Sequence, residues 1–247
     1  MEGPGVHAIA ARLSSLAGRR VAGSIGRSRF PLGRLDGGTV ARVRAVGKLL
    51  FIEVPPCTLR IHFLMWGRYR LEGEIPGKTP RLAISFDDGS TLRLYATAIA
   101  LFSSGAAAVH PDPTLDPLDA GWDLERAARL VKARGDELIC DTLMDQAVLP
   151  GVGNIIKNEA LFAARVHPAS PSGCIPARAL RRLLTGVRDF SLTMFECDRE
   201  VKSLRPFLKV YRKKVCPECG GKTESGRPGS LERISYWCPA CQKRYRC

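Results

Sequence analysis

The chain has 247 residues, of which 45% are hydrophobic, and a formal net charge of +14. This length suits one large domain or, more typically, two domains of about 120 residues, each with its own core. The sequence contains no apolar run of about 18 residues and no secretion signal, so we expect an intracellular protein without a membrane partner. The charge favours a polyanionic partner, above all nucleic acid. Residues 200–247 contain 12 Lys or Arg and 4 Glu, which places +8 of the charge there.

The chain begins with Met1-Glu2-Gly3-Pro4. A terminal α-amine has a reference pKa of about 7.7–8.0, so part of it is unprotonated and nucleophilic at neutral pH. Glu2 adds a carboxyl group that can donate or accept a proton. Alone, these four residues favour an ordinary frayed terminus. Apolar residues recur at helical spacing from Val6 to Leu16, however, and predict a helix, stopped by Gly18, that anchors the terminus.

From about residue 21 to residue 100 the pattern is strand-like. Short segments rich in β-branched and aromatic residues alternate with Gly, Pro and Asp. The segment Asp87-Asp88-Gly89-Ser90 has the composition of a hairpin turn. We therefore predict an antiparallel sandwich or barrel. The clearest strands are Thr39–Val46, Leu49–Val54, Leu59–Phe63, Arg81–Phe86 and Thr91–Tyr95.

Two loops in this region are candidates for contacts with a ligand. Gly47 allows a tight turn that presents Lys48, which could bind a phosphate, although a solvated hairpin lysine is the commoner case. In the second loop, bulky apolar residues precede Gly67. Core packing usually explains such a cluster, but a protein that extrudes a base needs a wedge to fill the vacated space.

The second half of the chain is predominantly helical. Residues 103–121 lack periodicity and resemble an interdomain linker. Glycines precede a helix that begins near Asn154, and such a helix N-terminus can bind a phosphate oxygen. An ordinary helix start is at least as common for a Gly-x-Gly sequence. The predicted helices are Leu124–Ala133, Glu137–Gln146, the segment after Gly153, and Ala177–Phe195.

The strongest spacing signal is a pair of Cys-x-x-Cys motifs. Cys216 and Cys219 are followed, after 18 intervening residues, by Cys238 and Cys241. This spacing predicts a four-thiolate zinc site that is structural, because four protein ligands leave no open position for catalysis. Arg233, shortly before the second pair, would be presented from a rigid strand. The scattered Cys57, Cys140, Cys174 and Cys197 are typical of reduced thiols, and Cys247 has no partner spacing.

Together these motifs resemble the Fpg/Nei family of DNA glycosylases, most closely its Nei branch. The resemblance covers nearly the whole chain: Glu-Gly-Pro at the start, a Gly-Lys hairpin in a β-sandwich, the Gly-Val-Gly-Asn segment at 151–154, and a finger with Arg-x-Ser-x-x-Cys. It implies an α+β fold with an N-terminal antiparallel β-sandwich, a C-terminal helix-two-turns-helix domain and a β-hairpin zinc finger. The corresponding domains are 1–118, 119–205 and 206–247.

The resemblance also implies roles for individual residues. The residue before the family's Glu is the Schiff-base nucleophile, and that position is Met1 here, so we expect a retained Met1 with Glu2 as the acid. The partner is DNA with damaged bases or abasic sites, bound by a monomer in the nucleoid or nucleus; Zn²⁺ is structural, and no small-molecule cofactor is expected. The expected DNA contacts are Lys48, Asn154, Lys157 and Arg233, with Leu64, Met65 and Trp66 in the void-filling loop and Met65 as the preferred wedge.

The implied activity is base excision with an associated AP lyase step, directed at oxidised pyrimidines or hydantoins. Gly5 stands where many Nei enzymes have a second Glu, so we expect strand cleavage to be weaker than base removal. The main alternative is a non-catalytic protein of the same fold that binds damaged or single-stranded DNA. A zinc-finger interaction protein that uses its basic tail on RNA is a third hypothesis.

Overall fold

The computed structural model describes residues 1–27, 30–103 and 111–247. The chain divides into two compact units, one formed by Met1 and Val6–His110 and the other by Glu2–Gly5 and Pro111–Cys247. We refer to them as the β unit and the helical unit. The predicted domain limits at 118/119 and 205/206 stay predictions. No helix among the described residues is long and apolar enough to cross a membrane.

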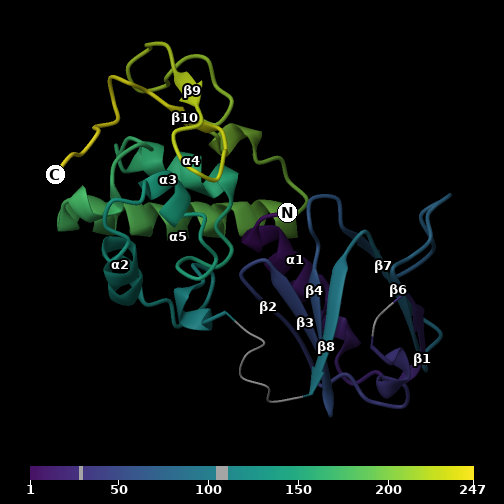
Figure 1. The fold of residues 1–247 in the computed structure, drawn as a ribbon. Helices are drawn as coiled ribbons and strands as arrows, with labels where there is room; N and C mark the ends of the chain where they lie inside the picture. The colour runs from purple at the N-terminus through teal and green to yellow at the C-terminus, as the bar shows by residue number, and fades with distance from the viewer. Residues whose placement is uncertain (28–29, 104–110) are drawn as a thin grey trace. The chain divides into compact units, whose positions relative to one another are not determined.

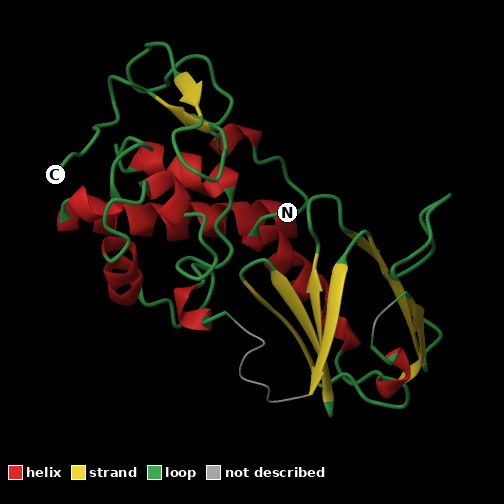
Figure 2. Ribbon diagram, in the orientation of Figure 1, coloured by secondary structure: helices red, strands yellow, loops and turns green. Residues whose placement is uncertain are grey.

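The β unit contains two antiparallel four-stranded sheets (Figure 1, Figure 2), which confirms the predicted sandwich. One sheet has the strand order β1-β6-β7-β5 and the other β2-β3-β4-β8. The five strands singled out in the sequence are present, and three more complete the sheets. The strands are β1 (Val21–Gly26), β2 (Arg42–Val46), β3 (Leu49–Val54), β4 (Cys57–His62), β5 (Arg68–Arg70), β6 (Leu82–Phe86), β7 (Thr91–Tyr95) and β8 (Ala98–Ser103).

Helix α1 (Gly3–Leu13) begins three residues earlier than predicted and is followed by a 3-10 turn at Ser14–Leu16. Val6 and Leu13 on α1 are buried in the core of the β unit together with Leu16. Gly18 has φ +87°, a conformation that favours glycine, so the predicted stop after the helix is confirmed. The first residues of the chain therefore lead directly into a packed helix.

The helical unit is built around helices α2 (Leu124–Lys132), α3 (Ile139–Thr142), α4 (Asn154–Ala163) and α5 (Ala177–Arg199). Helix α4 packs against α5 (Figure 1). Ile156 and Leu161 on α4 and Leu183 and Val187 on α5 belong to one buried apolar cluster. This cluster fixes α4, from which the polar contacts described below originate.

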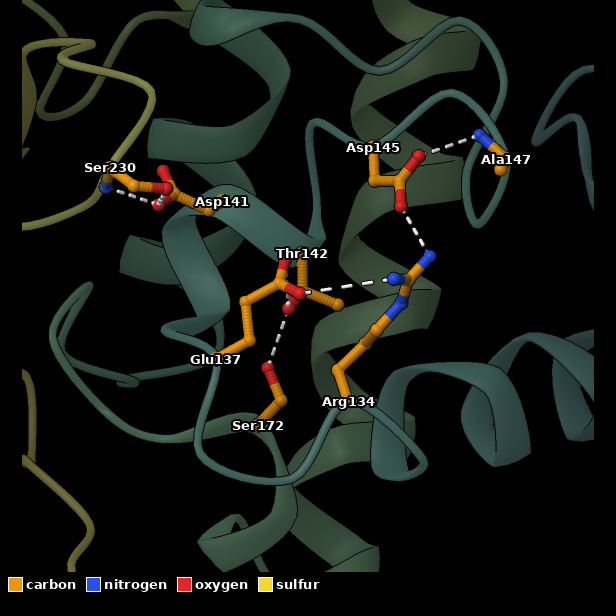
Figure 3. Close-up of polar contacts among 8 residues, drawn as sticks. All are labelled: Arg134, Glu137, Asp141, Thr142, Asp145, Ala147, Ser172 and Ser230. Atoms are coloured by element: carbon orange, nitrogen blue, oxygen red, sulfur yellow. Dashed lines mark hydrogen bonds and ion pairs between the residues drawn. The ribbon is translucent and has the colours of Figure 1, made fainter.

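The predicted helix Glu137–Gln146 is much shorter in the structure, where only α3 is helical (Figure 3). Asp145 accepts the N–H of Ala147 at 2.9 Å and also binds the Arg134 guanidinium. Thr142 donates its hydroxyl hydrogen to Glu137 at 3.2 Å and accepts one from Ser172 at 2.9 Å. Asp145 binds a nearby backbone N–H, which competes with helix formation, and Thr142 and Asp145 also bind Ser172 and Arg134 outside the segment, so the helix ends early.

The segment predicted as a linker, 103–121, contains the boundary between the two units at 110/111. Residues 104–110 lie outside the described residues. After them, Pro113–Leu115 forms a 3-10 turn whose N-cap is Asp112, and Asp112 also forms an ion pair with Arg126 at 2.6 Å. Leu115 is buried in the core of the helical unit. The part from residue 111 onward belongs to the helical unit, because a cap and one apolar anchor suffice to fix a segment without periodicity.

The C-terminal part of the helical unit contains a short antiparallel hairpin of β9 (Glu224–Gly226) and β10 (Ser235–Trp237), and β10 lies beside α4 (Figure 1). Beyond the hairpin, Cys247 forms a disulfide with Cys174. This pair corrects the interpretation of Cys174 as a reduced thiol and of Cys247 as incidental. Their separation of 73 residues gives no recognisable motif in the sequence.

Candidate active site

The terminal amine lies at a loop of the β unit. The nitrogen of Met1 donates a hydrogen bond to the carbonyl oxygen of Leu64 at 3.1 Å. The Met1 residue is 45% exposed, so its surroundings are partly open to solvent. The frayed-terminus alternative does not fit this arrangement, because the amine has a defined partner and the following helix is packed.

Leu64 belongs to a tight loop, Phe63–Gly67, that projects three apolar side chains. The N–H of Gly67 donates to the carbonyl oxygen of Phe63 at 2.7 Å, and a Cβ at Gly67 would lie 2.0 Å from that oxygen. Only glycine permits this closure. Leu64, Met65 and Trp66 are 49%, 65% and 75% exposed, in contrast to the core packing that usually explains such residues. Their role as a wedge stays a prediction.

From the sequence, His62 is expected to be structural or solvated, and in the structure it precedes this loop. Its Nδ1 accepts the N–H of Leu64 at 3.1 Å, so the imidazole helps to fix the loop. Burial lowers the pKa of His62, and the positive charges of Lys48, the terminal amine and Arg60 lower that pKa further. A neutral imidazole is the form that can accept at Nδ1. An isolated histidine at a strand end carries no sequence signal for this contact.

Lys48 occupies the two-residue turn between β2 and β3, where Gly47 has φ +57°. Lys48 is half-buried, and its charge, like that of the terminal amine, lowers the pKa of His62. The β unit thus brings together Met1, Lys48, His62 and the Phe63–Gly67 loop. The predicted contact of Lys48 with a phosphate stays a prediction.

In the helical unit, the carboxylate of Glu2 is bound by the N-terminus of α4. Oε1 accepts the N–H of Ile155 at 2.7 Å and Oε2 accepts the N–H of Ile156 at 3.3 Å. The helix has no side-chain cap of its own at Gly153. Glu2 therefore satisfies two of the N–H groups that a helix start leaves unpaired. This corrects the interpretation of the helix N-terminus as a phosphate cradle, because these two donors bind Glu2.

Glycines allow this approach. A Cβ at Gly153 would lie 2.3 Å from Cδ of Glu2, and a Cβ at Gly3 would lie 2.6 Å from Cα of Gly151. The N–H of Gly3 donates to the carbonyl oxygen of Gly151 at 2.8 Å. Gly151 itself has φ +95°. The Gly-x-Gly sequence therefore makes room for the start of the chain.

The side chains of Asn154 and Lys157, the two predicted DNA contacts on α4, differ in their hydrogen bonding. The Oδ1 atom of Asn154 is buried and has no hydrogen-bond partner among the described residues, and the contact of Asn154 with DNA stays a prediction. Lys157 is completely buried, and its ammonium donates to Oγ of Ser235 at 2.9 Å and to the carbonyl oxygen of Ile234 at 3.4 Å. The prediction that Lys157 contacts DNA is wrong, because its charge is used inside the protein.

Lys157 is the first of three consecutive residues by which α4 holds the C-terminal finger. Oδ1 of Asn158 accepts the N–H of Tyr236 at 2.7 Å. The carboxylate of Glu159 accepts three backbone N–H groups, from Lys209 at 2.8 Å, Val210 at 3.1 Å and Tyr211 at 2.7 Å. Burial raises the pKa of Glu159, and these hydrogen bonds oppose that rise. The same helix thus holds Glu2 at its first turn and the finger just beyond it.

Arg233 is exposed, and it precedes β10 instead of lying in it as predicted. Among the described residues it has no hydrogen-bond or ion-pair partner. The segment before it is attached to α3, because Asp141 accepts the N–H of Ser230 at 2.5 Å and its hydroxyl hydrogen at 3.0 Å (Figure 3). With Lys157 bound to Ser235, Arg233 lies between two attachment points on the helical unit.

The four predicted metal ligands converge. The Sγ atoms of Cys216, Cys219, Cys238 and Cys241 all lie within 4.8 Å of one another. The distance is 3.9 Å between the Sγ atoms of Cys216 and Cys241 and 3.5 Å between those of Cys219 and Cys238. Tetrahedral coordination with Zn–S bonds of about 2.3 Å requires S···S distances of about 3.8 Å. The donor set and its spacing fit one zinc ion.

Comparison with known families identifies the class. Residues 1–97 match the formamidopyrimidine-DNA glycosylase N-terminal domain and residues 111–200 match the formamidopyrimidine-DNA glycosylase H2TH domain. The chain belongs to the Fpg/Nei family of DNA glycosylases, in its Nei-like branch. This confirms the resemblance drawn from the sequence.

Individual proteins similar to this chain include members of the Nei-like branch. The chain is 37% identical over 223 residues to Endonuclease 8-like 3 of Mus musculus, covering 87% of this chain but only 37% of that protein. It is 31% identical to Endonuclease 8 2 of Mycobacterium tuberculosis, covering 96% of this chain and 97% of the relative. Among solved structures, a viral DNA glycosylase superposes with a TM-score of 0.86 at 23% identity, covering 98% of this chain and all of that one.

A second structural neighbour is formamidopyrimidine-DNA glycosylase of Lactococcus lactis, non-covalently bound to DNA that contains an abasic site. It superposes with a TM-score of 0.85 at 20% identity and covers 99% of this chain and 100% of that one. At this identity the two structures establish a shared fold. That fold agrees with the predicted α+β architecture.

Proposed function

We propose that the protein is a base-excision-repair DNA glycosylase with an associated AP lyase activity, which removes oxidised pyrimidines or hydantoins. Membership of the Fpg/Nei family supports this proposal. The observation that carries it is that both of the first two residues are held by hydrogen bonds. The Met1 amine donates to the carbonyl oxygen of Leu64, and the Glu2 carboxylate accepts N–H groups at the start of α4. Its substrate would locate the protein in the nucleoid or nucleus.

The chemistry uses the α-amine of Met1 as nucleophile. The amine attacks C1′ of the damaged nucleotide, the bond from C1′ to the base breaks, and the base leaves with a proton. The carboxylate of Glu2 takes the proton that the attacking amine loses and delivers it to the ring oxygen of the sugar. The ring then opens and leaves a protonated imine between Met1 and C1′. Elimination of the 3′ phosphate then cuts the strand. Gly5 supplies no second carboxylate, so base removal exceeds strand cleavage.

DNA is held through its phosphates by Lys48, Asn154 and Arg233. Asn154 lies at the start of α4, and its side-chain NH₂ group is the part that can donate to a phosphate oxygen. The Phe63–Gly67 loop fills the space of the extruded nucleotide, with Met65 as the leading residue. Zn²⁺, when bound by the four cysteines, holds the finger that presents Arg233. Affinity for DNA falls steeply with salt.

Borohydride trapping on an oligonucleotide with an abasic site tests the proposal. Reduction converts the imine into a stable adduct, and peptide mass spectrometry locates it. We expect the adduct on the α-amine of Met1. An adduct on an internal lysine, or DNA binding without any adduct, would refute the mechanism and leave the non-catalytic binding protein.

Two variants sharpen this test. Glu2→Gln keeps an acceptor for the α4 amides but loses the proton, so it should bind DNA with wild-type affinity and excise at least about 100-fold more slowly. A chain with one residue added before Met1 should bind but form no adduct at that position. Glu196→Gln, at an exposed site on α5, serves as the matched control and should behave like the wild type.

A further inference from the structure

A basic cleft lies on the finger beside the hairpin of β9 and β10. It has a volume of about 510 Å³, and its lining includes Arg212, Lys213, Lys214, Lys222, Glu224 and Tyr236. Four basic residues and one acidic residue thus line the cleft. Among the described residues, none of these cations takes part in an ion pair. Arg233 does not line the cleft, and the proposed excision chemistry uses none of its residues.

The backbone that carries these cations is fixed. Glu159 holds the three residues before Arg212 through their N–H groups. The N–H of Lys213 donates to the carbonyl oxygen of Val210 at 3.1 Å, and Thr223 donates to the carbonyl oxygens of both Lys213 and Lys214. Val215 and Lys222 form an antiparallel bridge. A ligand that binds here therefore orders little of the protein backbone, which lowers the entropic cost of binding.

The cleft also has an aromatic wall. Tyr236 is half-buried, its N–H is held by Asn158, and its ring meets that of Tyr211 edge to face with a centroid distance of 5.2 Å. The guanidinium of Arg212 lies 5.4 Å from the centre of the Tyr211 ring. Fixed rings beside unpaired cations are the components that bind single-stranded nucleic acid, with the rings for bases and the cations for phosphates.

The size and concave shape of the cleft favour an unpaired nucleotide over a duplex as its ligand. A volume of about 510 Å³ is in the range of small-molecule sites, large enough for an unpaired nucleotide and too small for a duplex. A base in a duplex is stacked and paired, so it cannot reach a ring inside such a cleft without being extruded. An unpaired strand presents its base and its phosphate at once.

We propose that this cleft is a second DNA subsite, which binds an unpaired nucleotide of the strand outside the damaged position. Its phosphates lie on Lys213, Lys214 and Lys222, and its base lies against Tyr236. This inference rests on the proposed function, which identifies the polymer as DNA. It adds the position at which an extended single strand continues along the protein.

The test compares a cleft variant, Lys213→Gln with Lys214→Gln and Lys222→Gln, with a control of equal charge change. The control carries Arg129→Gln, Arg178→Gln and Arg246→Gln, which are exposed residues outside the cleft. Affinity is measured against salt concentration for two abasic single strands, one spanning only the lesion and its neighbours and one extended on both sides. A blunt duplex of the longer length is measured in parallel.

We expect the slope of log affinity against log salt to fall by about 2 for the cleft variant on the extended strand, since each lost phosphate contact on a single strand contributes about 0.7. The short strand and the duplex should give the wild-type slope, and the control variant should give it throughout. An extended strand with 5-iodouracil should photocrosslink to Tyr236. An unchanged slope on the extended strand, or an equal fall on the short strand or the duplex, would overturn the proposal.

Borohydride trapping on the short strand keeps the two hypotheses separate. All three proteins should trap it to the same extent, because the cleft residues do not touch the reacting nucleotide. Absence of trapping in the wild type would refute the proposed function. The dependence of the salt slope on strand length would still show whether the cleft binds DNA.

Discussion

Glu159 offers the sharpest test of how the finger is attached to the helical unit. Its carboxylate accepts three N–H groups from residues 209–211, at 2.7 to 3.1 Å. Glu159→Ala leaves three donors unpaired, and each costs about 1–3 kcal/mol where water cannot replace the acceptor. Val210 is fully buried and Lys209 is exposed, so the penalties are unequal. Relief of the buried charge offsets part of the loss, and we expect a net destabilisation of about 3–5 kcal/mol.

Glu159→Gln separates the charge from the shape. Its amide oxygen can still accept the N–H groups of Val210 and Tyr211, which both bind Oε1, while its NH₂ group faces the N–H of Lys209. One hydrogen bond is lost and two change from charged to neutral, so we expect a cost of about 1–3 kcal/mol. The free energy of unfolding should therefore decrease from the wild type to Glu159→Gln and further to Glu159→Ala, and this order is characteristic of the contact.

Hydrogen exchange measures this directly, because the amides of residues 209–211 are the donors. We expect their protection to fall in the same order, accompanied by faster release of zinc to a chromogenic chelator. Glu196→Gln on α5 is the control, since its carboxylate is half exposed and pairs with Arg199. Equal protection of these amides in the wild type and Glu159→Ala would refute the reasoning, as would a Gln variant less stable than the Ala variant.

Three further predictions concern the site and its supports. In Gly153→Ala the new Cβ would lie 2.3 Å from Cδ of Glu2 and displace the carboxylate, so excision should fall by about 100-fold or more while DNA affinity is retained; wild-type turnover would contradict this. Removal of metal with a chelator should unfold the β9–β10 hairpin and weaken DNA binding, whereas the circular dichroism of the helices should persist. Burial lowers the pKa of Lys157 from 10.5 to about 8, so the folded chain releases this proton before the unfolded chain does. The free energy of unfolding should therefore rise by up to about 3 kcal/mol between these pH values, and urea titrations of Lys157→Met should show a smaller rise.

The architecture was predictable wherever the signal was local. Alternating β-branched residues gave the strands of the sandwich, and Cys-x-x-Cys spacing gave a cluster whose Sγ atoms meet within 4.8 Å. The start of α4 at Asn154 followed from the glycines before it. The prediction of a helix over Glu137–Gln146 failed because Thr142 and Asp145 bind Ser172 and Arg134 outside this segment, contacts that helical periodicity does not report.

The site was predictable in composition and less so in geometry. Lys157 is a basic residue on a segment expected to contact DNA, but its partners Ile234 and Ser235 are more than 70 residues away in the sequence. Nothing local distinguishes a lysine that binds a buried hydroxyl from one that binds a phosphate. The same holds for His62, whose contact with Leu64 depends on the closure of a loop by Gly67.

The two donors that hold Glu2 are backbone N–H groups, a property that every residue except proline shares. Ile155 and Ile156 can therefore be exchanged for many residues with this contact left in place, and an alanine scan of α4 would not detect it. The contact depends on sequence at two other positions. Gly153 must lack a side chain, and residue 2 must have the extra methylene that distinguishes Glu2 from aspartate. Shortening Glu2 to Asp, or placing proline at 155, is the kind of change to which this contact responds.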